Sequence, residues 1–487
     1  MKAGLAFLGG FFPPDLRPSY LAALAEPLAE TVGIVLGAMT LASLLGLTLG
    51  MAAAARLPGS RALLAALALF RAVPDLMVAV FCVVLFGIGT GAALVALVLY
   101  YTAVMAKVFA DLMASAPALP LEALNATGAS RTQLALLGLV PLTSAHLLAY
   151  GAFAFECALR AAVIVGAVGG GGIGAELSGS LAAYDLPRAT TLILLLVLLI
   201  AALDRAADWL RERPRWLLVL VPVGLVCAGL YGPAWAAPRH GMKVAAEMLP
   251  PTLGPEALSK LPGLVWETLW MAAAGTAGAA VIAWVAALAA AHRFAPLALR
   301  WPTRRLLELL RTVPEVVFGM VLVAFVGIGP TAGAWALGLH SIGSLGRLFA
   351  DALDNAPEAP QQALASTGAS RLAVACYATV PLALGPIATH LLFRFEWNLR
   401  MATVLGLIGA GGIGQALFEA QQLFFYREAL AYVIVTAALV LATDAASGHL
   451  RQRIGLIRYG SAISSPFCLA ALEPAPGLGR QPPAQAQ

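Results

Sequence analysis

The stretch EALNATGASRTQLALLGLVP, residues 122–141, is a polar interruption between long apolar segments. It returns as QALASTGASRLAVACYATVP at residues 362–381, so that Gly128 of the shared TGASR corresponds to Gly368, 240 residues later. When residues 71–174 are compared with 311–414, about 40 of about 104 positions are identical without a gap, which indicates an internal duplication. We therefore expect two copies of one structural unit, each carrying one such polar loop.

The composition excludes a soluble globular protein. Of 487 residues, 61% are hydrophobic and 11% charged, so lipid must replace water as the solvent for much of the chain. The net charge of +5 includes no block of Lys and Arg interleaved with aromatic residues, and we expect no nucleic-acid partner. The five cysteines lack CxxC or CxxH spacing, so neither a disulfide nor a metal site is predicted. We also expect no cleavable signal peptide.

Apolar stretches long enough to cross a bilayer, roughly 20 residues each, recur along the chain. They lie near residues 31–55, 62–87, 90–116, 141–166, 189–210, 216–236, 269–292, 303–327, 330–356, 381–406 and 428–446. This pattern predicts an all-α polytopic membrane protein of about 11 transmembrane helices, arranged as two parallel five-helix repeats plus one linking helix. The expected divisions are an N-terminal surface segment (1–29), a first helical domain (30–215), a linking helix with an extracytoplasmic loop (216–262), a second helical domain (263–455) and a disordered cytoplasmic tail (456–487).

The distribution of arginine predicts the orientation of the two copies. Arginines cluster on one side of the predicted spans, which the positive-inside rule makes the cytoplasmic side, and both polar loops then lie there. Five spans alone would invert the second copy, and the additional span at 216–236 restores its orientation. The repeats are therefore expected to be related by an axis along the membrane normal.

Each polar loop predicts two short helices joined by a bend. In the first loop these helices cover residues 121–126 and 132–139. Gly128 permits the sharp turn, and Ser130 is placed to cap the second helix. An ordinary connector between spans is the alternative. Duplication of the loop with TGASR intact favours a surface that a partner binds.

Charged residues inside the predicted spans need partners, because an isolated charge there costs a few kcal/mol. Glu156 and Arg160 lie at i, i+4 with the acid first, and Glu396 and Arg400 repeat the arrangement. One interpretation is a self-neutralising structural pair in each copy. The other is that the two arginines face each other across a central pathway and bind a passing anion, since guanidinium groups suit phosphate and phosphonate oxygens.

A second set of charges has the reverse order along the helix. Arg71 precedes Asp75, and Arg311 precedes Glu315, again at i, i+4. The same two interpretations apply to these pairs, as structural ion pairs or as part of a substrate pathway.

Glycine runs close one span in each copy, at residues 169–174 and 409–414. They do not predict a nucleotide site, because neither follows a soluble strand and neither carries GK[ST]. We expect a bend or a close helix crossing at the extracellular mouth, with a gate formed by Gly169, Gly171, Gly172, Gly174, Gly409, Gly411, Gly412 and Gly414. Pro74 and Pro314 are expected to kink the second span of each copy.

These motifs together resemble a known family. Glu122-Ala123, followed by Gly128 and then by Pro141, looks like the EAA loop of importer-type ABC transporter permeases. The blocks RAVPD/RTVPE, ATGASR/STGASR, FECALRAA/FEWNLRMA and GGGGIG/GAGGIG are similar to those of phosphonate-type permeases of bacterial inner membranes. The resemblance covers about residues 30–455 and implies two type I permease units fused in one chain.

The resemblance also implies partners and a cargo. A cytoplasmic ABC ATPase dimer would bind the two loops, an extracytoplasmic substrate-binding protein would deliver the substrate, and the cargo would be phosphonate or a related phosphorus oxyanion. The chain itself would carry no cofactor and catalyse no reaction. The ATPase-coupling residues would be Glu122, Ala123, Gly128, Ala129, Ser130, Arg131, Pro141, Gln362, Ala363, Gly368, Ala369, Ser370, Arg371 and Pro381.

Two features depart from the family pattern. Gln362 replaces the glutamate expected in the second loop, and the first copy has no counterpart of the span at 216–236. A different class of function also fits an apolar protein with intramembrane carboxylates, namely an autonomous ion-coupled secondary transporter or channel. Such a protein would move its substrate alone, whereas a permease needs an ATPase and a binding protein.

Overall fold

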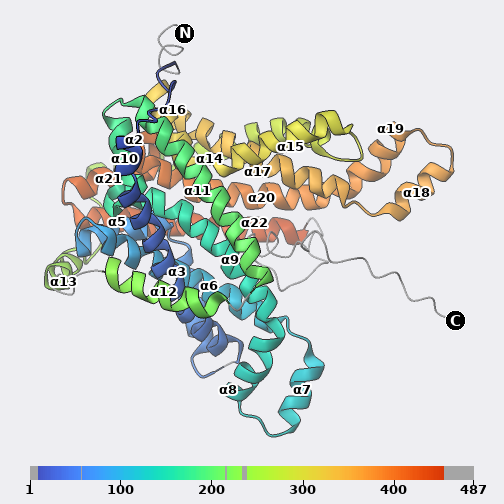
Figure 1. Ribbon diagram of the computed structural model, residues 1–487, viewed down its shortest axis with the longest axis horizontal. Coiled ribbons are helices and arrows are strands. Elements are labelled where there is room, and N and C mark those ends of the chain that lie inside the picture. The colour runs from blue at the N-terminus through green and yellow to red at the C-terminus, as the bar shows by residue number, and fades with distance from the viewer. Residues whose placement is uncertain (1–8, 56, 214–215, 233–237, 454–487) are drawn as a thin grey trace.

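In the computed structural model, residues 9–55, 57–213, 216–232 and 238–453 are described, and every regular element in these ranges is helical (Figure 1). The first copy comprises α3 (Ala25–Ala54), α4 (Ser60–Arg71), α5 (Asp75–Phe86), α6 (Thr90–Ala114), α7 (Ala118–Ala126), α8 (Arg131–Gln133), α9 (Val140–Val165), α10 (Gly172–Ala182) and α11 (Leu186–Glu212). The second comprises α14 (Pro255–Ala290), α15 (Leu297–Thr312), α16 (Glu315–Val326), α17 (Pro330–Asp354), α18 (Glu358–Ser366), α19 (Arg371–Val374), α20 (Val380–Leu405), α21 (Gly412–Gln422) and α22 (Tyr426–Arg453). Outside the two copies lie α2 (Pro18–Ala23), α12 (Leu217–Tyr231) and α13 (Pro238–Glu247). The predicted tail at 456–487 and the first eight residues lie outside the described ranges.

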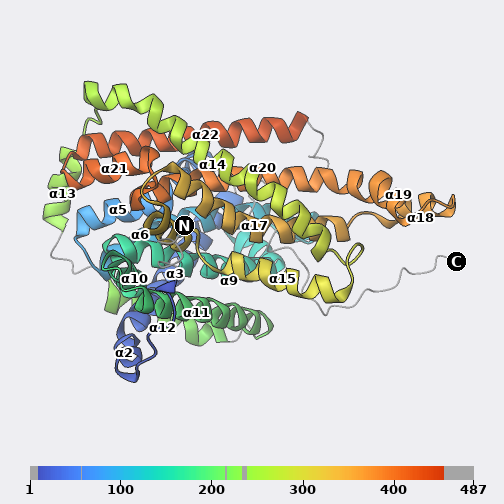
Figure 2. The same cartoon turned by 90° about the horizontal axis from the view of Figure 1, so that it is seen from above.

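The two copies have the same order of elements, which confirms the duplication. Each copy projects one arm from the helical body, with α7 and α8 at the tip of the first arm and α18 and α19 at the tip of the second (Figure 1). The arms extend in different directions. Helices α10 and α21 both lie on the left in the two views, away from the tip of the second arm (Figure 2). Each copy therefore has its arm at one end and its glycine turn at the other, as expected for two repeats of one unit.

The helices suit a polytopic membrane protein. Within the described ranges, seven are long and apolar enough to cross a bilayer, and nine spans result if each of two bent helix pairs counts as one. Helix α17, the counterpart of α6, is less apolar because it carries His340, Ser341 and Arg347. Helix α12 has 15 residues, fewer than the roughly 20 that an upright span requires. With these two helices the total agrees with the predicted eleven.

Proline bends the second span of each copy, as predicted. The chain turns by 91° between the helices on either side of Pro74 and by 83° between those on either side of Pro314. Each proline is the residue before a new helix, because its ring lacks an N–H and the residue preceding it disfavours helical dihedrals. Arg71 and Asp75 therefore lie on separate helices, as do Arg311 and Glu315, so their i, i+4 spacing is interrupted by the bend.

Small residues allow two long helices of each copy to cross closely. In the first copy, a Cβ added to Gly50 of α3 would lie 3.0 Å from the carbonyl oxygen of Ala106 in α6. In the second copy, a Cβ on Gly275 of α14 would lie 2.9 Å from the carbonyl oxygen of Ala334 in α17. Close backbone approach of this kind drives helix association where lipid replaces water, because packing supplies the attraction.

The linking helix α12 packs against α3 of the first copy. Gly33 and Gly37 on α3 face Tyr231 and the backbone of Ala228 on α12, and a Cβ on Gly37 would come within 2.8 Å of the Ala228 nitrogen. Gly224 of α12 lies against the Thr40 side chain of α3. Both helices thus present small residues four apart at their contact, the pattern of close membrane-helix pairs.

The N-terminal segment docks on the start of α11. The backbone N–H of Asp15 donates to the Pro187 carbonyl at 3.2 Å, and the Thr191 hydroxyl donates to the Asp15 carbonyl at 2.8 Å. A side-chain hydrogen bond from Arg17 lowers the pKa of the Asp15 carboxyl to about 2. Asp15 is therefore ionised at neutral pH and forms ion pairs with Arg17 and Arg188.

Candidate functional site

The turn in each arm has the predicted geometry. Gly128 and Gly368 have φ values of +82° and +83°, and no atom lies within 4 Å of a Cβ built on either residue. Glycine is therefore needed at these positions for its backbone conformation and not for lack of space, since residues with a side chain rarely adopt positive φ. The Ser130 hydroxyl accepts a hydrogen bond from the Gln133 N–H at 3.3 Å, while Gln133 Oε1 accepts one from the Ser130 N–H at 2.8 Å. This capping box, and the matching cap by Ser370, confirm the predicted bend and cap.

The second short helix of each loop was predicted wrongly. No separate helix ends near residue 139. Instead α8 continues through a π-helical segment, Leu134–Leu139, directly into α9, and α19 continues through Ala375–Thr379 into α20. Pro141 and Pro381 lie in the first turn after these segments. A π-helical turn accommodates a proline because the i→i−4 ladder is already interrupted there. Each arm is thus the extended end of a membrane helix, so a force on the arm acts directly on that helix.

Both arm tips expose apolar side chains. Leu119 and Leu137 on the first arm and Leu372 and Tyr377 on the second are more than half exposed, with Leu119 and Tyr377 each at 80%. Glu122 and Gln362, which occupy matching positions, are exposed as well. The arms project away from the body, so these surfaces suit contact with another protein.

The glycine runs form tight turns between two helices at the other end of the body. Gly169, Gly171 and Gly172 have φ values of +111°, +82° and +67°, and Gly409, Gly411 and Gly412 have values of +98°, +90° and +70°. Each turn reverses the chain from a long span into a short helix, α10 or α21. Gly174 and Gly414 touch the carbonyl oxygens of Val163 and Thr403 so closely that a Cβ would collide with them. The predicted bend and close crossing are confirmed.

Two acid–threonine pairs hold these turns in place. The Glu30 carboxylate accepts a hydrogen bond from the Gly172 N–H at 3.0 Å, and the Thr31 hydroxyl accepts one from the Ile173 N–H at 2.9 Å. Glu267 and Thr268 do the same for the second turn, at 2.9 and 3.0 Å. Carboxylates suit the N-terminus of a helix, where backbone N–H groups lack partners. The sequence shows Glu-Thr twice at matching positions but does not show which amides it caps.

Replacement of Gly414 by alanine is expected to destabilise the protein by about 1–3 kcal/mol, the usual range for overpacking. The new methyl group would collide with the Thr403 carbonyl oxygen, and backbone cannot move aside as a flexible side chain can. Thermal denaturation of the purified protein in detergent would measure the loss. Gly278→Ala is the matched control, because Gly278 lies on an exposed helical surface with nothing within 4 Å. Equal midpoints for both variants would contradict the tight crossing.

The charged pairs of the two copies differ. Arg160 Nη2 lies 2.5 Å from Glu156 Oε1, so the i, i+4 pair predicted for the first copy is confirmed. In the second copy it was wrong: Glu396 pairs with Arg451 and Arg400 pairs with Asp444, both at 2.8 Å. The reason is tertiary, because α22 places an acid and a base beside α20 and each finds a partner across the helix interface.

The bend of the second copy contains a buried polar cluster that sequence analysis missed. Glu315 Oε1 lies 2.9 Å from the Trp397 indole nitrogen, 3.2 Å from His340 Nε2 and 3.4 Å from Arg394 Nη2. Glu315 is 6% exposed and His340 is 3% exposed. The Arg394 guanidinium also donates to Ser341 Oγ at 2.8 Å. A buried carboxylate that accepts hydrogen bonds from the Trp397 indole and the Arg394 guanidinium is a satisfied group, as charges in a membrane interior must be.

The first copy places apolar or aromatic residues at the matching positions. The residues 240 positions before His340, Arg394 and Trp397 are Tyr100, Ala154 and Cys157. This difference within the repeat was visible in the sequence, but only the structure shows that the three second-copy residues converge on one carboxylate. The interior of the protein is therefore asymmetric although its backbone is duplicated.

Arg71 and Arg311, the remaining pathway candidates, lie at the C-terminal ends of α4 and α15, just before the proline bends. Both are partly buried. No group of three or more His, Cys, Asp or Glu residues in the described part of the chain is arranged to hold a metal ion.

The match to known proteins agrees with this arrangement. The family model described as "Binding-protein-dependent transport system inner membrane component" matches twice, at residues 46–216 and 279–456. The chain is 32% identical over 407 residues to the phosphate-import permease protein PhnE of Mycolicibacterium smegmatis, which covers 79% of this chain and 76% of that one. It is 42% identical over 187 residues to the phosphite transport system permease protein PtxC of Stutzerimonas stutzeri, covering 38% and 68% respectively.

Among solved structures, an inward-facing form of the MetNI methionine ABC transporter is 19% identical, with a TM-score of 0.38, and the match covers 42% of this chain and 99% of that one. The duplicated fold has two permease units, and the family model covers each of them in turn. The chain belongs to the binding-protein-dependent transport system inner membrane components, with two units of that family fused in one multi-pass protein of the bacterial inner membrane.

Proposed function

We propose that the chain forms the whole translocation pathway of an ATP-driven importer, with one ATPase dimer bound to its two arms and a phosphorus oxyanion as cargo. The observation that carries the proposal is the pair of arms, each with a left-handed glycine turn and a serine cap, projecting from the corresponding end of each repeat. On this proposal the chain is a transport subunit, and ATP is hydrolysed by its partner.

The arms supply the contacts that such a partner needs. Their exposed apolar side chains, among them Leu119 and Tyr377, fit a groove on a soluble domain. Because each arm continues into a membrane helix without a break, movement of the ATPase would act directly on α9 and α20. The proposed coupling residues are Glu122, Ala123, Gly128, Ala129, Ser130, Arg131 and Pro141 with Gln362, Ala363, Gly368, Ala369, Ser370, Arg371 and Pro381.

The opposite end suits the binding protein. The glycine turns lie there, and Ile88 and Ile328 beside them are 85% and 75% exposed. The Gly89 and Gly329 amides donate to the Gly169 and Gly409 carbonyls at 2.9 and 3.0 Å, so the exposed isoleucines belong to the same structure as the turns. We propose the glycine turns as the outer gate. The permease domains would span 30–215 and 263–455, joined by 216–262.

The cargo is proposed from relatives and from charge. Relatives that match most of their length are named for phosphate and phosphite, and guanidinium groups bind such oxyanions well. Arg160 and Arg400 occupy matching positions of the two repeats, with Glu156, Glu396, Arg71 and Arg311 as the further candidates for the pathway. Each of the two central arginines has an acidic partner, so a purely structural role is the alternative that a test must separate.

Changing Arg160 and Arg400 together to glutamine is expected to lower oxyanion uptake per folded molecule by about tenfold or more, the effect of losing charge-assisted contacts worth over a kcal/mol. Uptake should be normalised to the folded permease recovered from membranes. Arg451→Gln is the control, since it breaks the partly buried pair with Glu396 and leaves both candidate arginines intact. If the double variant reduces folded yield but not normalised uptake, the arginines are structural.

Reconstitution tests the proposed function itself. In proteoliposomes, the chain alone should not move phosphate, phosphite or methylphosphonate, whereas the chain with its ATPase, its binding protein and ATP should accumulate at least one of them. Binding-protein-dependent stimulation of ATP hydrolysis across the same three anions would identify the cargo. Uptake by the chain alone, driven by a proton gradient, would instead show a secondary transporter.

A further inference from the structure

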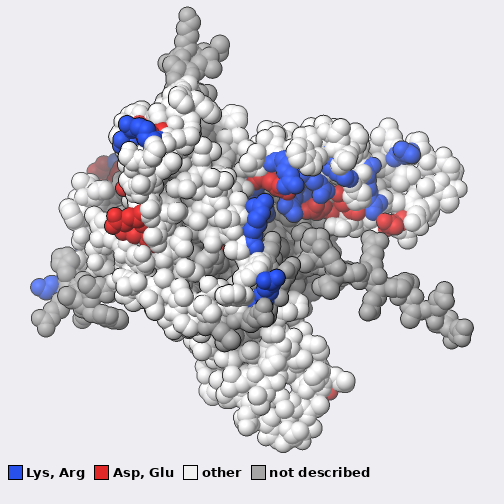
Figure 3. Space-filling view, viewed as in Figure 1, with Lys and Arg blue, Asp and Glu red and all other residues white. Residues whose placement is uncertain are grey.

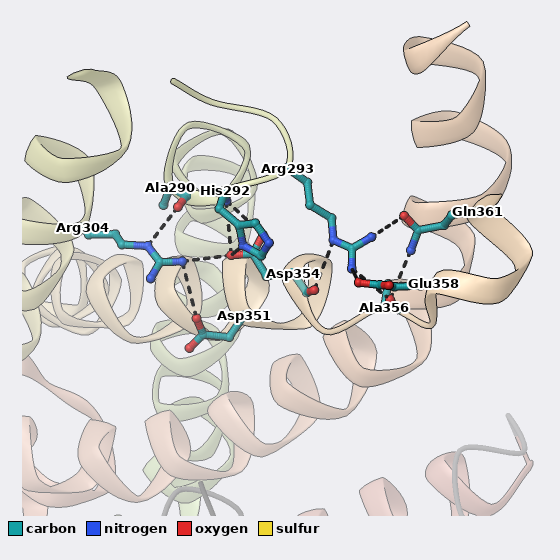
Figure 4. Close-up of polar contacts among 9 residues, drawn as sticks. All are labelled: Ala290, His292, Arg293, Arg304, Asp351, Asp354, Ala356, Glu358 and Gln361. Atoms are coloured by element: carbon teal, nitrogen blue, oxygen red, sulfur yellow. Dashed lines mark hydrogen bonds and ion pairs between the residues drawn. The ribbon is translucent and has the colours of Figure 1, made fainter. Parts of the chain in front are cut away.

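A cluster of polar contacts fastens the second arm to the helical body (Figure 4). At its centre is Arg293, in the turn between α14 and α15. Its guanidinium donates to Gln361 Oε1, the side chain of an α18 residue. It also donates to the carbonyl oxygens of Asp354 and Ala356 at 3.2 and 3.4 Å and lies 3.5 Å from Glu358 Oε1. One side chain from the body thus contacts the end of α17, the connection to the arm and α18 itself.

Gln361 completes the fastening from the side of the arm. Its amide nitrogen donates to the carbonyl oxygens of Ala356 and Pro357 at 3.1 and 2.9 Å. Its Oε1 accepts a second hydrogen bond, from the Thr379 hydroxyl at 3.2 Å, where the arm returns to the membrane. Gln361 is 8% exposed. A buried amide with all these contacts has one orientation, because rotation would leave polar groups unpaired.

A second group of contacts steadies the turn that carries Arg293. Asp354, the last residue of α17, accepts hydrogen bonds from the His292 N–H at 2.9 Å and from the Arg304 guanidinium at 2.9 Å. Arg304 also donates to the Ala290 carbonyl at the end of α14. The ends of α14, α15 and α17 are therefore joined through Asp354, and the turn is held on both sides of Arg293.

The first arm lacks the side-chain acceptors of this cluster. The residues 240 positions before Gln361, Asp354, Glu358 and Thr379 are Leu121, Ala114, Ala118 and Leu139. Leu121 instead packs its side chain against Gly138. Arg56, between α3 and α4, lies outside the described residues, but none of the four matching side chains could accept a hydrogen bond from it. Figure 3 shows the same contrast: charged atoms gather over α15 and α17, and the arm bearing α7 is almost free of them.

We propose that the two arms are mechanically different, and that Arg293 and Gln361 are positioning residues that brace the second arm against α14 and α17. The first arm, held by apolar contacts, pivots at its base. The cluster of hydrogen bonds permits one geometry, because hydrogen bonds are directional. Apolar side chains can slide past each other at little cost in free energy, because their attraction is non-directional. Given the proposed ATPase coupling, the braced arm transmits movement between the ATPase and α14 as a lever, and the first arm follows the docked ATPase.

Hydrogen exchange of the full chain in lipid nanodiscs tests the brace without any partner. Peptides from α7 and α18 form a matched comparison, since both helices have nine residues and a proline in the first turn. In the unchanged chain, the amides of α18 should exchange at least about tenfold more slowly than those of α7, because opening α18 breaks the buried hydrogen bonds of Gln361. Equal protection of α7 and α18 would overturn the proposal.

The chain supplies its own matched variants. Gln361→Leu with Thr379→Leu gives the second arm the residues of the first, and α18 protection should fall to that of α7. Arg293→Met removes the brace from the opposite side and should have the same effect, with α7 unchanged in both cases. The mirror variant, Leu121→Gln with Leu139→Thr, should not slow exchange in α7. If neither second-arm variant alters α18, the cluster does not brace the arm.

A functional measurement separates this inference from the proposed function. In the reconstituted complex, the Gln361→Leu, Thr379→Leu variant should keep ATPase binding but lose most of the stimulation of hydrolysis by the loaded binding protein. Loss of α18 protection with unchanged stimulation would retain the brace and overturn its role as a lever. Absence of any ATPase binding by the unchanged chain would refute the proposed function and leave the exchange result standing.

Discussion

Replacing Gly128 and Gly368 together by valine is expected to reduce ATP-dependent uptake to background while the protein remains folded in the membrane. Both residues have φ near +83° with open space around them, so the added side chain meets no neighbour and acts only on the backbone. A β-branched residue in this region costs about 1–3 kcal/mol, which the arm relieves by changing its turn. The tip would then no longer fit its partner. Uptake, ATPase binding and thermal midpoint should be measured on the same preparations.

Two controls separate the turn from general damage. Asparagine tolerates the left-handed region, so Gly128→Asn with Gly368→Asn should retain much of the uptake. Gly278→Val adds the same bulk at a glycine with equally open surroundings but ordinary helical dihedrals, and should leave uptake unchanged. Full uptake by the double valine variant would exclude both loops as the coupling site.

Changing Glu315 to leucine is expected to destabilise the protein by about 3–5 kcal/mol, the cost of leaving a buried charge without its partner. Arg394 and His340 would both face an apolar side chain in a region only a few per cent exposed. Most of the protein should then fail to reach the folded state at 37 °C. Unfolding in mixed micelles with increasing denaturing detergent, monitored by tryptophan fluorescence, would give the difference in free energy.

A double-mutant cycle assigns the loss to the pair. If the damage comes from the unpaired guanidinium, Glu315→Leu with Arg394→Met should recover about 1–3 kcal/mol relative to the single change. Glu256→Leu is the surface control, because its partner Lys260 is 64% exposed and such pairs contribute little. Equal losses in the single and double variants would mean that Glu315 acts through packing alone.

The backbone was largely predictable because the chain repeats itself. Features that depend on one residue and its immediate neighbours, such as the turn at Gly128, the cap by Ser130 and the bend at Pro314, follow from local chemistry, and duplication shows which of them matter. The spans were predictable for the same reason, since hydropathy is a local property.

Contacts between elements were not predictable, and the wrong ion-pair prediction fell where the copies diverge. Glu396 and Arg400 have the spacing of an ion pair, yet both bind α22, because a partner on an adjacent helix can compete with one four residues away. The difference between Glu122 and Gln362 was noticed in the sequence, but both side chains are exposed. The neighbouring difference, Leu121 against Gln361, changes what is buried at the base of the arm. Sequence alone does not show which of the two differences, Glu122 against Gln362 or Leu121 against Gln361, matters for the structure of the arm.

The contact between α12 and α3 shows where the chain divides into two. By sequence, α12 belongs to neither repeat, and the division at residue 215 follows from counting spans. By packing, α12 belongs to the first repeat, because it covers the face of α3 that carries Gly33 and Gly37. By packing, the boundary between the two units therefore lies after α12, whereas the count of spans places it before that helix.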